Sequence, residues 1–256
     1  MARLTSRPLA AAAALAAAWI ALNAGAAGAF QLLPMSMQFA PAGNDAVQTF
    51  AVNNEAGGPV AVQLYVVQRV IAQDGTETLT PADADFLVFP PQAVVPGGRT
   101  QLIQVRWLGS RAPATELAYR IIAEQLPVTL EDRAVLGGRL EILMRYEGSL
   151  YVTPAGAAPN VVVDSVSRAQ TADGPKLVVV LHNRGTAHGL LNQVALTVNS
   201  KAADGSTATV ELRNEALGGM TSPNILAGNR REFQLPWPAA LAADGLTATL
   251  RTNYVR

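Results

Sequence analysis

The sequence predicts an all-β protein built from two immunoglobulin-like β-sandwich domains. After residue 29, short apolar runs alternate with Gly, Pro, Asn and Asp, which is the pattern of a β-sandwich. No segment in this region shows the period of an amphipathic helix. The composition changes at Thr153–Asn160, where the stretch TPAGAAPN has nothing to bury, so we expect a domain boundary there.

The first segment, residues 1–29, has the features of a cleaved secretion signal. Arg3 and Arg7 precede the apolar run Leu9–Leu22, and Ala27–Ala29 is a small-x-small cleavage site. A second cut is available at Ala24–Ala26. An uncleaved membrane anchor is the less favoured alternative, because the run is shorter than the ~20 residues of a spanning helix. The segment therefore predicts export to the periplasm.

The first domain is expected at residues 30–154, with seven strands. They are Met35–Phe39, Ala46–Asn54, Val60–Ile71, Asp85–Val95, Thr100–Trp107, Leu117–Val128 and Gly138–Pro154. Asp74-Gly75 and Pro96-Gly97-Gly98 are turn signals between them. Seven strands at this spacing fit one immunoglobulin-like domain.

A linker at residues 155–160 is expected to lead into a second, smaller β-sandwich at residues 161–256. Its strands are predicted at Val161–Ala169, Lys176–Gly185, Leu191–Asn199, Thr207–Asn214, Arg231–Pro238 and Leu246–Arg256. Asp-Gly pairs at 173–174, 204–205 and 244–245 mark turns between them.

The last strand of the first domain has one strongly apolar face. In GRLEILMRYEGSLYVTP, the side chains of Leu140, Ile142 and Met144 lie two apart and so share a face, whereas the opposite face is mostly charged. In a sandwich such residues commonly complete the domain's own core, so core packing is one interpretation of this pattern.

Charge and cysteine content exclude several classes of protein. Loss of Arg3 and Arg7 with the signal leaves 17 basic against 19 acidic residues, a net charge of −2. The chain therefore lacks the excess of positive charge that is typical of nucleic-acid-binding proteins. The sequence has no cysteine, which rules out disulfides, thiolate metal sites and a cysteine nucleophile.

The sequence contains no motif that indicates an enzyme. We expect no cofactor, no metal and no small-molecule substrate. His182 and His188 lie six apart, whereas a metal pair on one strand would lie two apart, so we assign both to the fold. The sequence has no Gly-x-Ser-x-Gly elbow, P-loop or His-Glu-x-x-His motif. Trp107, Trp237 and Tyr119 are assigned to the core.

Three segments of the first domain resemble the PapD-like periplasmic chaperones of the chaperone–usher pilus pathway. Phe89–Gly109 is similar to the family's strand–PPxxxLxPG–strand segment, and Glu116–Pro127 to its ESLFYxxxxEIP segment. SLYVTP at Ser149–Pro154 takes the place of the KLFYRP that closes the family's first domain. Val178–Thr197 and Ile225–Pro238 are looser matches to the second domain.

The resemblance implies that the two domains are set at an angle with a cleft between them, and it implies a function for the apolar face. A pilus subunit in this family is a sandwich that lacks one strand, and the chaperone inserts its own last first-domain strand into the exposed groove. Aligned on Pro154, the donor positions fall on Leu140, Ile142 and Met144. The partners implied are pilus or fimbrial subunits and an outer-membrane usher. The same apolar edge would allow a self-capping dimer of the free protein.

Burial of the three donor side chains would stabilise a complex by about 1.5–3 kcal/mol each, roughly 5–9 kcal/mol before the costs of ordering and association. The competing hypothesis is an exported Ig-like structural or adhesive surface protein with no client subunit. The edge of the last strand distinguishes the two, since a donor strand must be accessible and an adhesin's would be fully paired. An exported hydrolase would need a catalytic cluster that the sequence lacks.

The chain departs from the family at the positions that bind the subunit's C-terminal carboxylate. Aligned here, the classical Arg and Lys are Ser36 and Ser149, which indicates a divergent, archaic-like branch. We hypothesise that Arg120, Arg145 or both receive the carboxylate through a guanidinium fork. The alternative is ordinary ion pairing of these arginines with Glu124 or Glu147.

The arginine that bridges the two domains in the family is also replaced. Thr153 takes its position, while Glu116 and, less securely, Asp244 stand where its acidic partners are expected.

Overall fold

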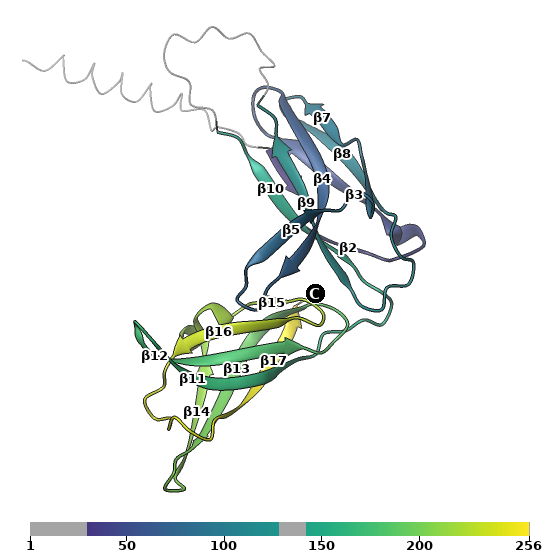
Figure 1. The fold of residues 1–256 in the computed structure, drawn as a ribbon. Helices are drawn as coiled ribbons and strands as arrows, with labels where there is room; N and C mark the ends of the chain where they lie inside the picture. Colours follow the sequence, from purple (N-terminus) through teal and green to yellow (C-terminus); the bar gives the residue numbers. More distant parts are fainter. Residues whose placement is uncertain (1–29, 128–141, 256) are drawn as a thin grey trace, which may run out of the picture.

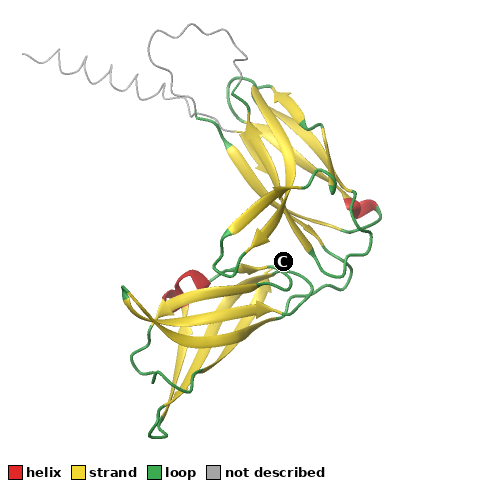
Figure 2. Cartoon of the chain, viewed as in Figure 1, coloured by secondary structure: helices red, strands yellow, loops and turns green. Residues whose placement is uncertain are grey.

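The protein folds into two β-sandwich domains, which confirms the predicted fold class (Figures 1 and 2). The computed structural model describes residues 30–127 and 142–255. Apart from strands, this part contains only two short 3₁₀ helices, η1 (Asn44–Ala46) and η2 (Asn214–Met220). None of its helices is long and apolar enough to cross a membrane. The predicted secretion signal and the start of the predicted last strand lie outside the described residues.

The first domain packs two sheets face to face. One has the strand order β1-β3-β8-β6, and the other has the order β2-β10-β9-β4-β5 with β7 also paired to β4. The strands are β1 (Phe30–Leu33), β2 (Ser36–Phe39), β3 (Val47–Asn54), β4 (Val60–Ile71), β5 (Glu77–Pro81), β6 (Phe86–Phe89), β7 (Gln92–Val95), β8 (Arg99–Trp107), β9 (Leu117–Gln125) and β10 (Arg145–Val152). The pairing of β10 with β2 is parallel.

Alternate residues of both sheets fill the first core, as the period of two requires. Phe50 and Ile103 of one sheet and Ile121 of the other are fully buried. Trp107 and Tyr119 also lie in the core, as predicted, in an edge-to-face arrangement with ring centroids 5.8 Å apart. Such aromatic pairs add about 0.5–1.5 kcal/mol beyond the area they bury.

The strands of this domain differ from the predicted ones in several places. The predicted strand Asp85–Val95 is two strands in different sheets, because the Pro90-Pro91 pair lacks the N–H groups that a continuous ladder needs. Strands β1 and β5 were missed. Strand β10 begins at Arg145, although the carbonyl of Met144 already accepts a hydrogen bond from the Gln125 N–H at 2.9 Å.

The second domain also packs two sheets around its own core. One has the order β11-β12-β16, and the other has β13 at its centre, paired to β14, β15 and β17. The strands are β11 (Val161–Thr171), β12 (Gly174–Asn183), β13 (Gly189–Lys201), β14 (Thr207–Arg213), β15 (Asn224–Ile225), β16 (Arg230–Pro236) and β17 (Thr247–Val255). All six predicted strands are present. The two-residue strand β15 and the helix η2 were missed, since neither carries a periodic apolar pattern.

The two sandwiches meet at an angle, with the β4–β5 hairpin of the first domain against the second (Figure 1). The Glu232 N–H donates to the carbonyl of Gln73 at 2.7 Å. Ile71, Tyr151 and Leu226 form a small buried apolar cluster across the junction.

The linker between the domains packs closely on the β12–β13 loop. The Arg184 N–H donates to the carbonyl of Asn160 at 2.8 Å. A Cβ atom added at Gly185 would overlap the carbonyl oxygen of Ala158, so a side chain at this position would displace the linker.

Candidate functional site

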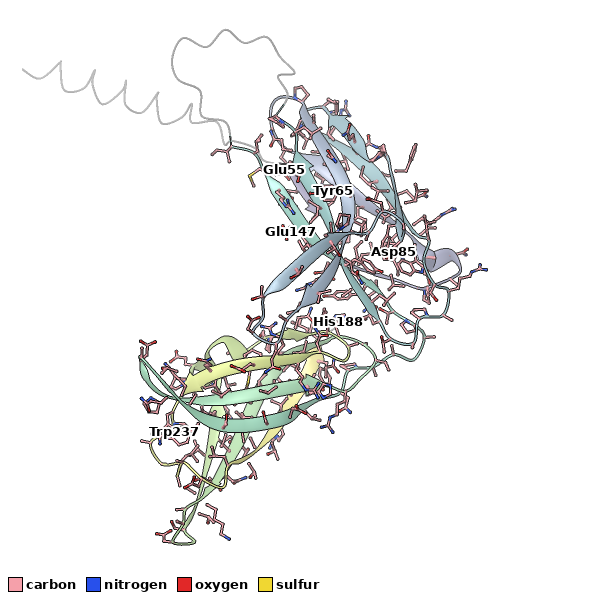
Figure 3. All side chains as sticks on the ribbon, viewed as in Figure 1. Glu55, Tyr65, Asp85, Glu147, His188 and Trp237 are labelled. Atoms are coloured by element: carbon pink, nitrogen blue, oxygen red, sulfur yellow. The ribbon has the colours of Figure 1, made fainter. Side chains whose placement is uncertain are left out.

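In the part of the chain that the structure describes, half of the β10 edge has no partner strand. Strand β9 pairs with β10 from Arg145 to Val152, but β2 covers the opposite edge only from Ser149 to Val152. Within residues 30–127 and 142–255, no strand pairs with that edge from Arg145 to Gly148. Figure 3 shows Glu147 on this stretch of the strand.

The phase of the β9–β10 ladder determines which backbone groups face outward. The bond between the Gln125 N–H and the Met144 carbonyl makes these two residues a hydrogen-bonded pair. In an antiparallel ladder the next residue then directs its N–H and C=O to the other side. Arg145 and Glu147 therefore present unpaired backbone groups at the open edge. Such a row of groups is a template for another strand.

The side chains predicted to act as donors differ in their surroundings. Ile142 is 66% exposed, so the described part of the chain leaves most of its side chain uncovered. Met144 is partly buried and packs against the first-domain core. Leu140 lies outside the described residues. Of the two described positions, Ile142 is the one whose apolar surface is free.

The positions aligned with the classical carboxylate anchor are neighbours in space, and an arginine lies beside them. Ser149 on β10 is the register partner of both Ser36 on β2 and Arg120 on β9. Nη1 of Arg120 donates to the Ser149 hydroxyl oxygen at 3.0 Å. The guanidinium group therefore lies one strand away from the aligned site.

Glu77 on β5, a residue that no sequence motif indicated, holds this arginine in place. Nε and Nη2 of Arg120 donate to its two carboxylate oxygens at 2.7 and 3.0 Å, and Arg69 donates to it at 2.9 Å. Burial alone would raise the pKa of Glu77, but the hydrogen bonds and charges of Arg120 and Arg69 outweigh it and lower the pKa below its ordinary value. The hydrogen bond to Glu77 raises the pKa of Arg120.

Arg145 makes the surface ion pairs that the alternative interpretation expected. Its guanidinium lies 3.0 Å from Glu147 and 3.5 Å from Glu124, and the side chain is about half exposed. Exposed pairs of this kind contribute about 0–1 kcal/mol, so they exchange readily for another carboxylate.

A buried carboxylate joins the two domains at the end of β10. The Thr153 hydroxyl donates to Oε2 of Glu116 at 2.8 Å. Oε1 of Glu116 accepts the His188 backbone N–H at 2.8 Å and lies 2.7 Å from its Nδ1. The ring of His188 stacks on Tyr151 with centroids 3.8 Å apart. Figure 3 places His188 at the junction of the domains.

The contact between Glu116 and Thr153 agrees with the expectation that an acidic partner stands beside the position of the family's bridging arginine. The expectation for Asp244 was wrong. It lies in a turn whose backbone carbonyl accepts from the Lys201 N–H at 3.2 Å, at the other end of β13 from His188. His188 was assigned to the fold and its contact across the junction was missed, because a residue 72 positions from Glu116 gives no local signal. Within the described ranges, no three His, Cys, Asp or Glu residues gather as metal ligands would.

Comparison with known families decides the assignment of the first domain. Residues 38–158 match the family model described as pili and flagellar-assembly chaperone, PapD N-terminal domain. The first domain is therefore similar to the N-terminal domain of the PapD-like chaperones. The match runs from β2 through β10 into the linker and so includes the open edge and the Glu116 bridge. A comparison with curated proteins finds no match.

Solved structures of fimbrial and pilus chaperones share the fold of this chain. A chain of the CsuC–CsuE chaperone–tip adhesion subunit pre-assembly complex, from archaic chaperone–usher Csu pili of Acinetobacter baumannii, is 16% identical. Its TM-score is 0.56, over 83% of this chain and 89% of that one. The class 5 fimbriae chaperone CfaA is 14% identical with a TM-score of 0.55, over 89% and 100%. A chain of a chaperone–tip adhesin complex of CFA/I fimbriae is 15% identical with a TM-score of 0.52, over 80% and 87%. These likenesses concern the fold.

Proposed function

We propose that the protein is a non-enzymatic periplasmic chaperone that stabilises pilus or fimbrial subunits by donor-strand complementation and delivers them to an outer-membrane usher. The open edge of β10, with Ile142 exposed just before it, is the observation that carries the proposal. A surface protein without a client would be expected to pair this edge fully, and β2 pairs only half of it.

The proposed complex combines backbone pairing with side-chain burial. The outward N–H and C=O groups of Arg145 and Glu147 would extend the subunit's sheet by one strand. Ile142, with Leu140 before it, would fill the groove left by the missing strand. Burial of an isoleucine side chain stabilises by about 1.5–3 kcal/mol. Met144 already packs against its own core and would add less new burial.

The proposed anchor for the subunit's carboxylate is Arg120, with Arg145 as a second cation on the same face of β10 and β9. The support is the position of Arg120, whose Nη1 contacts the Ser149 hydroxyl beside the aligned classical site. A carboxylate could replace that hydroxyl as the acceptor while Glu77 keeps the guanidinium oriented. The use of a serine pair plus a neighbouring arginine supports placement in a divergent, archaic-like branch.

A pair of adjacent substitutions tests strand donation. Ile142→Glu and Leu143→Glu each place a carboxylate at an exposed position, 66% and 46% exposed, and differ in the face they occupy in an extended strand. The tagged mature protein is co-expressed with secreted proteins encoded beside its gene, and co-purification is measured. We expect Ile142→Glu to stay folded and lose the client, while Leu143→Glu retains it.

Equal retention of the client by both variants would contradict donation through Ile142. If wild type captures no β-rich subunit at all, the exported surface protein becomes the better hypothesis. The same variants test the proposed self-capping dimer, since size-exclusion chromatography of the free protein should show Ile142→Glu shifted to the monomer.

The anchor is tested separately with Arg120→Lys and Arg145→Gln, alone and combined. Lys keeps the charge that Glu77 requires but cannot form the fork. We expect the combined variant to bind the subunit about tenfold more weakly, which is the loss of one charge-assisted hydrogen bond. Arg99→Gln, an exposed arginine in the first domain, is the control. Unchanged affinity in the combined variant would remove both arginines from the site.

A further inference from the structure

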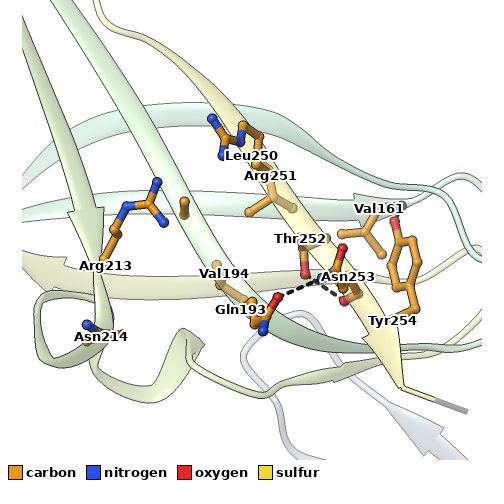
Figure 4. Close-up of a pocket in the computed structure, with 11 residues that line it drawn as sticks. Val161, Gln193, Val194, Arg213, Asn214, Leu250, Arg251, Thr252, Asn253 and Tyr254 are labelled. Atoms are coloured by element: carbon orange, nitrogen blue, oxygen red, sulfur yellow. Dashed lines mark hydrogen bonds between the residues drawn. The ribbon is translucent and has the colours of Figure 1, made fainter.

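The second domain has a large polar recess lined mainly by residues of β13, β14 and β17. Its volume is about 760 Å³, within the range of small-ligand sites, and every residue that lines it belongs to the second domain. Figure 4 shows the recess with Arg213, Arg251, Gln193 and Asn253 around it. None of these residues takes part in the proposed subunit site.

Two arginines flank the floor of the recess. Arg213 on β14 and Arg251 on β17 are both register partners of Ala195 on β13, from opposite sides. Their backbones are thus about 10 Å apart, two strand spacings, with only a methyl group between them. Long side chains can converge over such a short one. In Figure 4 both guanidinium groups extend toward the same side of the sheet.

The backbone beside the arginines is held in an uncommon conformation. Gln193 has a φ of 52° and Asn214 a φ of 51°, and in the described part of the chain these are the only non-glycine residues with positive φ. Both line the recess. Gln193 lies at a register shift of β13, where its side-chain Oε1 accepts a hydrogen bond from Nδ2 of Asn253 at 2.7 Å. Such positions cost about 1–3 kcal/mol and concentrate at binding sites.

One of the two positive charges lacks a partner. Arg213 pairs with Glu211 at 2.6 Å, whereas Arg251 makes no ion pair within the described residues. Hydrogen bonding from Arg213 lowers the pKa of Glu211, and the positive charge of Arg251 lowers it further. Both arginines therefore lie close enough to Glu211 to interact with its charge. The recess therefore has an excess of one positive charge.

We propose that this recess binds the phosphate group of a small soluble molecule between Arg251 and Arg213, with the Gln193 and Asn253 amides at its rim. A single guanidinium fork satisfies the two oxygens of a carboxylate. Two arginines approaching from opposite strands suit a tetrahedral dianion, which offers a third oxygen. The volume leaves room for the molecule that carries the phosphate.

The experiment is a titration of the mature protein with inorganic phosphate, followed by amide chemical shifts at constant ionic strength set with chloride. We expect saturable shifts at Gln193, Ala195 and Asn253. Arg251→Gln should weaken binding about tenfold, the effect of one charge-assisted hydrogen bond. Arg99→Gln removes an equal charge from the first domain and should leave the affinity unchanged.

A second substitution is expected to strengthen phosphate binding rather than weaken it. Glu211→Gln removes the carboxylate that competes for Arg213 and should tighten phosphate binding about two- to fivefold, the range of an exposed ion pair. Glu55→Gln makes the same charge change at an exposed position of the first domain and should have no effect. Shifts that rise linearly without saturation, or equal changes in test and control variants, would overturn the site.

The source of the phosphate is tested with two further probes. Glucose 6-phosphate should bind with the same dependence on Arg251 as inorganic phosphate. Binding to phosphatidylglycerol vesicles without binding to either soluble probe would overturn the proposal, because it would assign the recess to a lipid surface.

Discussion

The carboxylate of Glu116 should couple the unfolding of the two domains, and Glu116→Ala is the change that tests it. The residue is 7% exposed and its side chain almost entirely buried. Its oxygens contact the Thr153 hydroxyl at 2.8 Å and the backbone N and Nδ1 of His188 at 2.8 and 2.7 Å. The two contacts with His188 cross the junction between the domains.

The expected loss follows from these contacts. A hydrogen bond to a charged group contributes about 1.5–3 kcal/mol. Three such bonds to one carboxylate are not additive, and the freed groups of Thr153 and His188 regain contact with water. We therefore expect Glu116→Ala to lower the free energy of unfolding by roughly 3–5 kcal/mol. Glu116→Gln keeps an acceptor toward the His188 backbone but loses the charge, so it should cost about half as much.

Two measurements separate coupling from simple destabilisation. Urea unfolding followed by circular dichroism gives the total free energy, and hydrogen exchange of β9 and β13 peptides reports each domain. In wild type both sets of amides should open together, whereas in Glu116→Ala the two domains should open at different free energies. Glu147→Ala, at an exposed position, is the control and should change neither. A loss below about 0.5 kcal/mol with unchanged exchange would refute the bridge as a coupling element.

Further predictions concern the first core, the linker and acid sensitivity. Tyr119→Phe removes a hydroxyl that donates to Asp85 at 2.9 Å and should cost about 1–2 kcal/mol in urea unfolding, so a change below about 0.3 kcal/mol would contradict it. Gly185→Ala should cost about 1–3 kcal/mol because the new Cβ overlaps the linker, whereas Gly57→Ala has open space and should be neutral or slightly stabilising. The lowered pKa of Glu77 means that its ion pairs stabilise the fold above about pH 4.3, and that this stabilisation is lost as the pH falls through the lowered value. Glu77→Gln should therefore be less stable than wild type at pH 7 and approach it at acid pH, and a constant difference across this range would disprove the assignment.

Local patterns predicted most strands because burial in a sandwich imposes a period of two. Val60–Ile71 is a strand with these same bounds, since its apolar residues face a core in a central strand. The interval Asp85–Val95 was predicted as one strand, because apolar content alone cannot show that Pro90 and Pro91 send its halves to different sheets. Strand β5 carries one half-buried leucine among polar residues and gives no such pattern.

In the candidate site, too, features of a single segment could be predicted from the sequence, whereas a contact between distant strands could not. The apolar alternation of the last strand singled out Ile142 as a candidate donor, and alignment of the same segment with the family singled out Ser149. Apolar alternation and alignment can each be read from a single segment of the chain. The partner of Arg120 was not predictable, because Glu77 reaches it across two strand pairings, β5 with β4 and β4 with β9.

By itself, the sequence determined the fold class, the alternation of the last strand and the resemblance to one chaperone family. These depend on local composition and on the spacing of apolar residues, which the chain carries whatever its final topology. The tertiary structure decided that β2 leaves half of β10 open, that Glu116 meets His188, and that Arg213 and Arg251 flank Ala195. Each of these depends on strand order and register, which are set by the packing of residues far apart in the chain.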